Sequence, residues 1–304
     1  MNYIIMDLEW NNTYARKTKK FINEVIEIGA VKLDENLNLI DEFSCVIRSQ
    51  IGKKLRGSVK KLTNITNEEV RSGEPFSKVF SQFKKWVDKD SIVLTWGDGD
   101  VRVLIDNYSY LQGIERIPFL YYYGDLQAYI DEVLKVPKAK QIGLSAAAEE
   151  LNIPEDGYSL HRALDDSRLS AECLKKTFNK EKLLRYVKKC NDEFYARLSF
   201  KPYAISNIRS PLIDRSKLSY ECEICQGKCE QIGRWSFSNQ YFRGKFYCHH
   251  CNRLVRVSVR FKKYYDRIDV RKTVKLIEPE QMGPHEDSNC ALIESLPYTA
   301  EDKI

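Results

Sequence analysis

The stretch NYIIMDL at residues 2–8 is a nearly continuous apolar run. Such a run is typical of a strand that is buried on both faces, because neither face then needs polar side chains. The segments EVIEIGAVKL at 24–33 and LIDEFSCVI at 39–47 have the character of two further strands, and the turn-rich DENLN joins them. Three neighbouring strands with short connections predict an antiparallel meander.

Further along the chain the apolar residues change to a helical spacing. One helical stretch precedes SIVLTW at 91–96, which has the composition of a buried strand, and a helix is expected to begin near Asp100. Other helical patterns cover 125–134, 144–151 and 163–178. Residues 1–180 therefore predict an α/β domain in which helices flank a mixed sheet.

Composition divides the rest of the chain into three parts. Residues 181–216 show a charged helical pattern and then a stretch with two prolines, which we interpret as a helix and a linker. Residues 217–280 form a module rich in Cys, aromatic and basic residues, and the window 216–280 holds 14 Lys and Arg against 7 Asp and Glu. Because the 304-residue chain has a net charge of only +6, its positive charge is concentrated there. Residues 281–304 are an acidic tail that we expect to be disordered.

The first residues do not have the pattern of a secretory signal peptide. They lack a cationic start, and Asp7 and Glu9 interrupt their apolar run. No stretch approaches the roughly 20 apolar residues that span a bilayer. We therefore expect a cytoplasmic protein without a membrane partner, in which the nine cysteines are thiols or metal ligands instead of disulfides. The sequence does not specify an oligomeric state.

Asp7 and Glu9 lie two residues apart at the end of the first predicted strand. Side chains alternate along a strand, so the two carboxylates share a face. Two carboxylates on one buried face repel each other and resist the loss of water, and a divalent cation resolves both problems. The competing interpretation is that Glu9 is simply exposed where the strand ends.

Two later segments contribute further acidic residues and one histidine. Asp100 follows TWGDG at the end of the second buried strand, with Asp98 as the rival position. His161 and Asp166 lie in HRALDDS, where Asp165 is the alternative to Asp166. A lone histidine is more often structural than functional. This one lies five residues before the aspartate that completes a set of four carboxylates.

These pieces resemble the motifs of the DEDDh (DnaQ-like) family of 3′–5′ exonucleases. The matching residues are Asp7 and Glu9 for D-x-E, Asp100 for the aspartate at a helix start, and His161, Ala163 and Asp166 for H-x-A-x-x-D. The resemblance covers about residues 1–180, and the W-G-x-x-D form of the second motif is most similar to KapD-like and RNA-interference-type exoribonucleases. KLTNIT at 61–66 replaces the commoner LTGIT, which suggests an altered loop near the scissile nucleotide.

The resemblance implies an RNase H-like fold and a two-metal mechanism with Mg²⁺ or Mn²⁺, which are hard cations that prefer carboxylate oxygens. Asp7 would bridge both ions, Glu9 and Asp166 would complete one site, and Asp100 would support the other. His161 would deprotonate the attacking water. The implied reaction is hydrolysis of single-stranded nucleic acid, RNA in preference to DNA, to nucleoside 5′-monophosphates from a 3′ end.

The C-terminal module contains two C-x-x-C knuckles separated by 22 residues, Cys222-x2-Cys225 and Cys248-x2-Cys251. In a chain without disulfides this pattern predicts one structural Zn²⁺ in a zinc-ribbon-like β module. Four thiolates around Zn²⁺ can fold a unit that is too small to build its own core. Three neighbouring residues could replace one ligand: Cys229, His249 and His250.

After the second knuckle, LVRVSVRFK at 254–262 alternates apolar and polar residues. The alternation predicts a half-buried strand with a basic face formed by Arg256, Arg260 and Lys262. Basic faces with aromatic residues nearby bind phosphates and stack unpaired bases, so we predict nucleic-acid binding at this face. The competing interpretation is that the aromatic residues form the core of the module and the arginines keep it soluble.

Three functions fit the sequence. The leading one is an exoribonuclease whose zinc module grips RNA, and the second is a DNA-directed 3′–5′ exonuclease in repair or proofreading. The third is a non-catalytic nucleic-acid or protein adaptor that acts through the ribbon. The complete set of five catalytic residues argues against the adaptor. No motif reads a 2′-hydroxyl, so the first two remain open.

Overall fold

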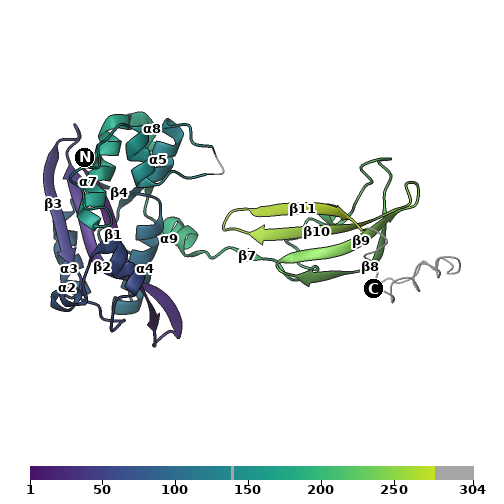
Figure 1. Ribbon diagram of the computed structural model, residues 1–304, viewed down its shortest axis with the longest axis horizontal. Helices are drawn as coiled ribbons and strands as arrows, with labels where there is room; N and C mark the ends of the chain where they lie inside the picture. The colour runs from purple at the N-terminus through teal and green to yellow at the C-terminus, as the bar shows by residue number, and fades with distance from the viewer. Residues whose placement is uncertain (138–139, 278–304) are drawn as a thin grey trace. The chain divides into compact units, whose positions relative to one another are not determined.

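A computed structural model describes residues 1–137 and 140–277 (Figure 1). The chain divides into two compact units, Met1–Ser199 and Phe200–Ile304. None of the helices in the described ranges combines the length and the apolar character that a membrane span needs. The predicted acidic tail, 281–304, lies outside the described residues.

The first unit is built on a six-stranded sheet in the order β3-β2-β1-β4-β5-β6. Its strands are β1 (Tyr3–Ala15), β2 (Lys20–Leu33), β3 (Leu39–Val46), β4 (Ile92–Thr95), β5 (Tyr122–Asp125) and β6 (Val187–Lys189). Strands β1, β2 and β3 pair antiparallel, which confirms the predicted meander, whereas β4 runs parallel to β1 and β5 parallel to β4. Strand β6 returns antiparallel at the edge, so the sheet is mixed as predicted.

Helices cover both faces of this sheet. They are α1 (Gly57–Thr63), α2 (Asn67–Ser72), α3 (Phe76–Trp86), α4 (Gly99–Gln112), α5 (Leu126–Val133), α6 (Leu144–Glu150), α7 (Ala163–Thr177), α8 (Lys180–Leu184) and α9 (Asp192–Ser199). This arrangement confirms the predicted α/β class, with an RNase H-like mixed sheet flanked by helices.

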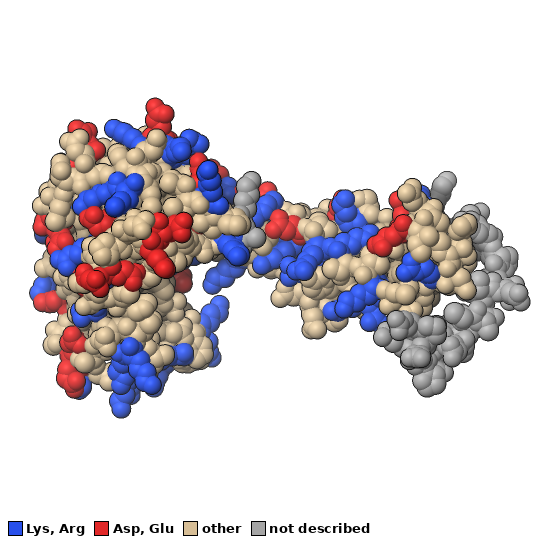
Figure 2. Space-filling model, turned by 45° about the horizontal axis from the view of Figure 1, so that its top comes forward, with Lys and Arg blue, Asp and Glu red and all other residues tan. Residues whose placement is uncertain are grey.

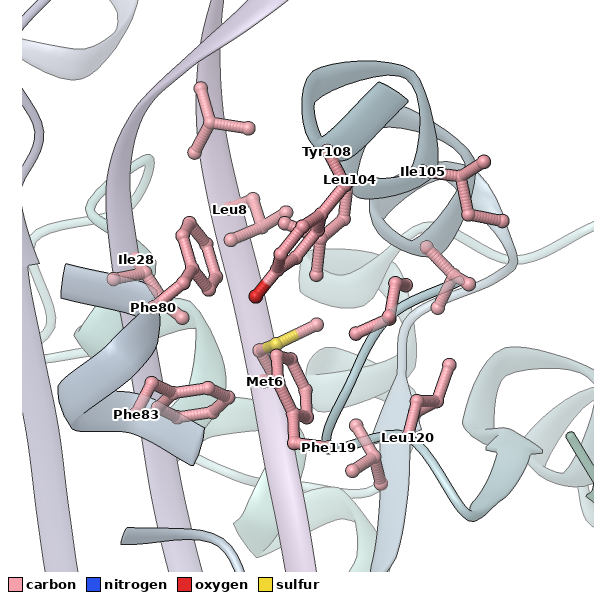
Figure 3. Close-up of a cluster of buried hydrophobic side chains, with 14 of the residues drawn as sticks. Met6, Leu8, Ile28, Phe80, Phe83, Leu104, Ile105, Tyr108, Phe119 and Leu120 are labelled. Atoms are coloured by element: carbon pink, nitrogen blue, oxygen red, sulfur yellow. The ribbon is translucent and has the colours of Figure 1, made fainter. Parts of the chain in front are cut away.

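Successive residues of β1 enter two different hydrophobic cores. Met6 and Leu8 pack with residues of α3 and α4, including Phe80 and Tyr108, as Figure 3 shows. Ile5 points to the opposite face, where it belongs to the core formed with α5, α6 and α7. Both faces of the strand are therefore buried, which explains the continuous apolar run at its start.

Helix α7 approaches the sheet unusually closely at Gly29 of β2. A Cβ atom at this position would lie 2.0 Å from the backbone nitrogen of Leu164, so only glycine leaves room for the helix. The hydroxyl of Ser167 donates to the carbonyl of Gly29 (3.0 Å) and to that of Ala163 (2.8 Å). Because Gly29 lies opposite Asp7 in the β1–β2 register, this contact holds the first turn of α7 beside Asp7.

Strands β1 and β2 are longer than the sequence predicted. Beyond a bulge after Glu9, they continue as a two-stranded hairpin to Ala15 and Lys20. The side chains of Asn12 and Asn23 hydrogen-bond across this hairpin (2.8 Å). The extension carries polar residues and no buried apolar run, so hydrophobic patterning gave no signal for it.

The second unit is a five-stranded sheet with β11-β10-β9-β8 as its main order. Its strands are β7 (Tyr203–Ala204), β8 (Glu230–Ser238), β9 (Tyr241–Cys248), β10 (Arg253–Lys263) and β11 (Ile268–Leu276), and all described pairings are antiparallel. Val255, Val257, Val259 and Phe261 of β10 alternate into one buried cluster. This confirms the predicted small C-terminal β module.

The boundaries between the parts differ from those predicted, which were 1–180, 181–216 and 217–280. The first unit continues to Ser199 because Phe194 and Tyr195 of α9 join its core. The stretch interpreted as a linker belongs to the second unit: β7 pairs with β10, and Ile205 and Ile213 are buried in the module's core. Isolated buried isoleucines without periodicity give no sequence signal of this kind.

Candidate active site

Asp7 and Glu9 lie on β1, which is paired on both sides only over its first residues. Strand β1 pairs with β4 from Tyr3 to Ile5, and the backbone beyond that point is free of this neighbour. The side chains of Asp7 and Glu9 lie on the same face of β1 as Ile5, and α7 partly covers this face. The two carboxylates therefore lie at the end of the buried core, on one face of the strand, as predicted from their spacing.

Asp100 reaches this position through a tight turn after β4. Gly97 adopts a left-handed conformation (φ +80°), and its carbonyl accepts hydrogen bonds from the Tyr123 hydroxyl (2.8 Å) and the Thr95 hydroxyl. Helix α4 begins two residues later with Asp100 in its first turn. The buried carboxylate of Asp100 accepts a hydrogen bond from the backbone nitrogen of Leu8 (3.1 Å), one residue from Asp7.

His161 and Asp166 lie on either side of the start of α7. His161 adopts a left-handed conformation (φ +64°), and its backbone nitrogen donates to the carboxylate of Asp166 (3.2 Å). A ring nitrogen of His161 and one carboxylate oxygen each of Glu9 and Asp166 all lie within 4.8 Å of one another. The structure therefore brings together residues that are about 150 positions apart in the sequence.

Two residues that the sequence analysis missed hold this junction together. Glu27 of β2 is 2% exposed and lies opposite Glu9 in the strand register. Its carboxylate accepts three hydrogen bonds from the Arg162 guanidinium, the shortest at 2.6 Å, and one from the backbone nitrogen of Ala163 at 3.1 Å. The ion pair between Glu27 and Arg162 holds Arg162, the residue that follows His161, in place. The interruption of an apolar strand pattern by Glu24 and Glu27 was the only signal for it.

The carboxylates perturb one another strongly. Burial, together with the charges of Asp100 and Glu9, raises the pKa of Asp7 well above its ordinary value. Burial and the nearby charge of Asp166 raise the pKa of Glu9 to about 8. Burial raises the pKa of Asp100 to about 7, and that of Asp166 to about 6 even though His161 opposes the shift. A group of acids with raised pKa values in one place is the electrostatic signature of a cation site or a catalytic site.

This donor set fits hard divalent cations. Carboxylate oxygens are the ligands that Mg²⁺ and Mn²⁺ prefer, and a bound cation would offset the repulsion that raises the pKa values of Asp7 and Glu9. Glu27 is already neutralised by Arg162 and is therefore not a candidate ligand. The four carboxylates that could hold metal are the predicted ones, Asp7, Glu9, Asp100 and Asp166.

The rival residues are engaged elsewhere. Asp98 pairs with Arg102 (2.8 Å) on the exposed side of α4. Asp165 pairs with Arg168 (2.9 Å) and accepts a hydrogen bond from the backbone nitrogen of Ser159 (3.0 Å). The geometry favours Asp100 and Asp166 as the members of the cluster.

The LTNIT variation has a simple local explanation. Asn64 ends α1 in the left-handed conformation (φ 57°), and its backbone nitrogen donates to the carbonyl of Lys60. Glycine and asparagine are the residues that adopt this conformation most readily, so asparagine can replace the commoner glycine. Thr66 then caps α2 in a capping box with Glu69.

A family model described as Exonuclease matches residues 4–174 of the chain. The chain belongs to this exonuclease family. The match covers strands β1 to β5, the helices from α1 to most of α7, and every residue of the carboxylate cluster. It confirms the recognition that was based on Asp7, Glu9, Asp100, His161 and Asp166.

Several curated proteins are similar in sequence to this exonuclease chain. The probable 3′-5′ exonuclease KapD of Bacillus subtilis (strain 168) is 29% identical over 61% of the chain and 87% of its own length. Human 3′-5′ exoribonuclease 1 is 26% identical over 49% of the chain and 44% of its own length. The DNA polymerase III PolC-type of Clostridium perfringens is 26% identical over 68% of the chain, a match that spans 13% of the polymerase.

A solved structure supports the fold of the exonuclease unit. The nuclease domain of 3′hExo, described as a DEDDh family member bound to rAMP, has a TM-score of 0.50 and 24% identity. The similarity covers 58% of this chain and 90% of that domain. Because the identity is below 25%, this likeness is evidence for the fold alone, and it supports the RNase H-like architecture of the first unit.

The second unit of this exonuclease contains a separate candidate metal centre. Cys222 and Cys225 lie before β8, Cys248 ends β9, and Cys251 lies in the turn before β10. Their sulfur atoms all lie within 4.8 Å of one another, with 3.7 Å between Cys222 and Cys251 and 3.5 Å between Cys225 and Cys248. Tetrahedral Zn²⁺ with Zn–S bonds of about 2.3 Å separates its sulfurs by about 3.8 Å, so the four thiols fit zinc.

The alternative zinc ligands do not join this group of four. His249 pairs with Glu230 (2.7 Å), and Cys229 lies outside the sulfur cluster. The Nδ1 atom of His250 lies 3.8 Å from the Cys251 sulfur, but His250 is not part of the cluster. Backbone N–H groups of Cys225 and Ile224 lower the pKa of Cys222 to about 6. Amide groups aimed at a sulfur favour the thiolate, the form that binds zinc.

Arg256, Arg260 and Lys262 lie on the face of β10 opposite to its buried valines. Arg256 stands directly between Lys245 of β9 and Lys275 of β11 in the strand register. Arg260 stands opposite Arg271, and its guanidinium lies 5.3 Å from the ring of Tyr241. Figure 2 shows Lys and Arg side chains spread along this unit.

Proposed function

We propose that the chain is a metal-dependent 3′–5′ exonuclease that hydrolyses single-stranded nucleic acid, RNA in preference to DNA, to nucleoside 5′-monophosphates. The observation that carries this proposal is the convergence of Asp7, Glu9, Asp100, His161 and Asp166 in an exonuclease-family unit, at the part of β1 just beyond its pairing with β4. Each of these groups matches a role that phosphodiester hydrolysis requires.

The carboxylates and the histidine of the cluster would have different roles in the reaction. Asp7, Glu9, Asp100 and Asp166 would hold two Mg²⁺ or Mn²⁺ ions, which when bound stabilise charge on the attacking and leaving oxygens. His161 takes the proton from the attacking water, because its ring lies beside Glu9 and Asp166 and an imidazole is a suitable base at neutral pH. The hydrogen bond from the backbone nitrogen of His161 to the Asp166 carboxylate holds His161 close to the carboxylates.

The relatives support RNA as the preferred substrate and leave one alternative. One relative is named an exoribonuclease, and KapD is named a 3′-5′ exonuclease. The polymerase relative supports the alternative of a DNA-directed exonuclease in repair or proofreading. The first unit contains the same carboxylate set in either case.

The test is hydrolysis of matched single-stranded RNA and DNA, each labelled at its 5′ end, with Mg²⁺ or Mn²⁺. We expect a ladder of products shortened one nucleotide at a time, release of nucleoside 5′-monophosphates, and faster loss of RNA than DNA. Faster loss of DNA would favour the DNA-directed alternative. Binding of both strands without cleavage would favour the non-catalytic adaptor.

We infer that the second unit holds the substrate through the basic face of β10. Like charges directly opposite each other on neighbouring strands destabilise a sheet, and Arg256 lies opposite Lys275 while Arg260 lies opposite Arg271 in one such row. A polyanion placed over this row would offset the repulsion. Tyr241 beside Arg260 adds an aromatic ring on which a base could stack.

Replacing Arg256, Arg260 and Lys262 together with alanine should weaken binding of long single strands. Each phosphate contact contributes a slope of about −0.7 to the log–log salt dependence, so three lost contacts should make the slope shallower by about 2. The measurement is Kd against salt concentration by fluorescence anisotropy. The matched control replaces Lys84, Lys85 and Lys89 of the first unit, which removes the same charge from exposed positions.

Zinc content should stay the same in both triple variants, which separates lost contacts from lost folding. Equal slopes for the basic-face variant and its control would show that β10 does not contact the substrate. The basic face would then serve the solubility of the module, as the competing interpretation of its sequence holds.

A further inference from the structure

The second unit contains a cavity that neither the carboxylate cluster nor the basic face uses. Its volume is 580 Å³, within the range of pockets that bind small ligands. Phe246 lines it, and Phe246 lies opposite Val255, on the buried face of the sheet. The cavity therefore lies on the other side of the sheet from Arg256.

One wall of the cavity is the indole ring of Trp235. A Cβ atom at Gly244 would lie 3.1 Å from each of three atoms at the ring fusion, so the indole lies flat on the glycine of the neighbouring strand. Its Nε1 donates to the Gln231 side chain (3.1 Å), and the edge of Phe246 contacts it with ring centroids 5.7 Å apart. One ring face is thus covered by the sheet, and the indole also lines the cavity.

Two arginines border the same space. Arg209 and Arg215 line the cavity, and both side chains are exposed. Neither forms an ion pair with a residue in the described ranges 1–137 and 140–277. Ile208 and Leu218 add apolar surface to the lining of the cavity. The site combines a flat aromatic surface, a small apolar wall and two uncompensated guanidinium groups.

This combination has the chemistry of a nucleotide site. A nucleobase stacks on an indole face without regard to its sequence identity, and guanidinium groups bind phosphate oxygens bidentately. A simple anion would not need the indole, and an apolar ligand would not need the arginines. Hydrogen-bonding of Nε1 to Gln231 leaves only the ring face for the ligand, which favours stacking over base-edge recognition.

We propose that this cavity binds one unpaired nucleotide of a single strand, with its base stacked on Trp235 and its phosphates on Arg209 and Arg215. The proposal rests on the proposed function, since it takes the strand to be the substrate. It adds a stacking site on the face of the module opposite to the basic face. A strand bound there is anchored by its bases as well as by its charge.

The test measures binding of a long single-stranded RNA to the full chain carrying Asp7→Asn, so that cleavage does not consume the ligand. Trp235 is the only tryptophan of the second unit. We expect RNA to quench tryptophan fluorescence, and we expect most of that quenching to disappear when Trp235→Phe is added. Trp235→Ala should weaken Kd by about 5- to 150-fold, the value of one base–aromatic stack.

The matched control is Phe237→Ala, which removes a 40% exposed ring from the same strand outside the cavity and should change Kd much less. Arg209→Ala with Arg215→Ala tests the site without altering the indole, and zinc content reports whether each variant is folded. Unchanged Kd in the arginine pair, together with equal quenching in Trp235→Phe, would overturn the proposal and point to a protein ligand. Cleavage by the chain with intact Asp7 is measured separately, so failure of the nuclease activity and failure of the stacking site are distinguishable.

Discussion

Asp7→Asn should lower kcat for single-stranded substrate by at least about 10³-fold. The charges of Asp100, Glu9 and Asp166 all raise the pKa of Asp7, so its carboxylate lies close to the other three. Removing its charge removes the ligand that would serve both ions, and with it several kcal/mol of transition-state stabilisation. The measurement is single-turnover hydrolysis at saturating Mg²⁺ or Mn²⁺.

Whether Asp7→Asn is folded can be tested separately, by measuring its thermal stability. In metal-free protein the raised pKa values of Glu9 and Asp100 mean that the folded state holds protons more tightly than the unfolded chain. Stability therefore falls as pH rises from about 4 to about 8, and a neutral side chain at position 7 should reduce that fall. We expect Asp7→Asn to match or exceed the wild-type Tm in a metal-free buffer at pH 8.

Asp98→Asn is the matched control for Asp7→Asn, because Asp98 lies in the same sequence motif as Asp100 but pairs with Arg102 on the surface. Its kcat should stay within a few-fold of wild type. Substantial activity in Asp7→Asn, or equal losses in the two variants, would contradict the assignment of the metal ligands.

His161→Ala should lower kcat by about 10²- to 10⁴-fold, the usual contribution of a general base, with substrate binding largely kept. Raising the pH should restore part of the rate, because hydroxide then replaces the missing base. The left-handed backbone at His161 strains alanine, so His161→Asn is the sharper variant: asparagine accepts a positive φ and cannot take the proton.

Both His161 variants are compared with His249→Ala, which removes an exposed histidine that pairs with Glu230 in the second unit. That change should leave kcat at the wild-type value. Wild-type turnover at neutral pH in His161→Asn would show that another group accepts the proton of the attacking water.

Much of the site was predictable because its signals are local. Strand alternation places Asp7 and Glu9 on one face, and the five-residue spacing keeps His161 near Asp166 across a helix start. The C-x-x-C spacing similarly predicts a four-cysteine cluster, since each knuckle is a local turn. Such features depend on a few neighbouring residues, so they can be recognised in a single sequence.

The missed features depend on contacts between distant residues. The Glu27–Arg162 ion pair joins positions 135 apart, and nothing near either residue identifies its partner. The close approach of α7 to Gly29 is also a property of the packed pair and not of either segment. Ile205 and Ile213 belong to the second unit because they pack in its core. Their irregular spacing in the sequence gave no sign of this packing.

The distance in sequence between β2 and the start of α7 also determines when the catalytic set forms during synthesis. His161 and Asp166 reach β1 only after α7 has docked on Gly29 and Ala163 has bonded to Glu27, 136 positions earlier. Contacts of such separation form late, because the intervening chain must be ordered first. A nascent or truncated chain that ends before His161 therefore lacks two of the five residues of the cluster, His161 and Asp166. We therefore expect a newly made molecule to have no exonuclease activity until nearly the whole first unit has been synthesised.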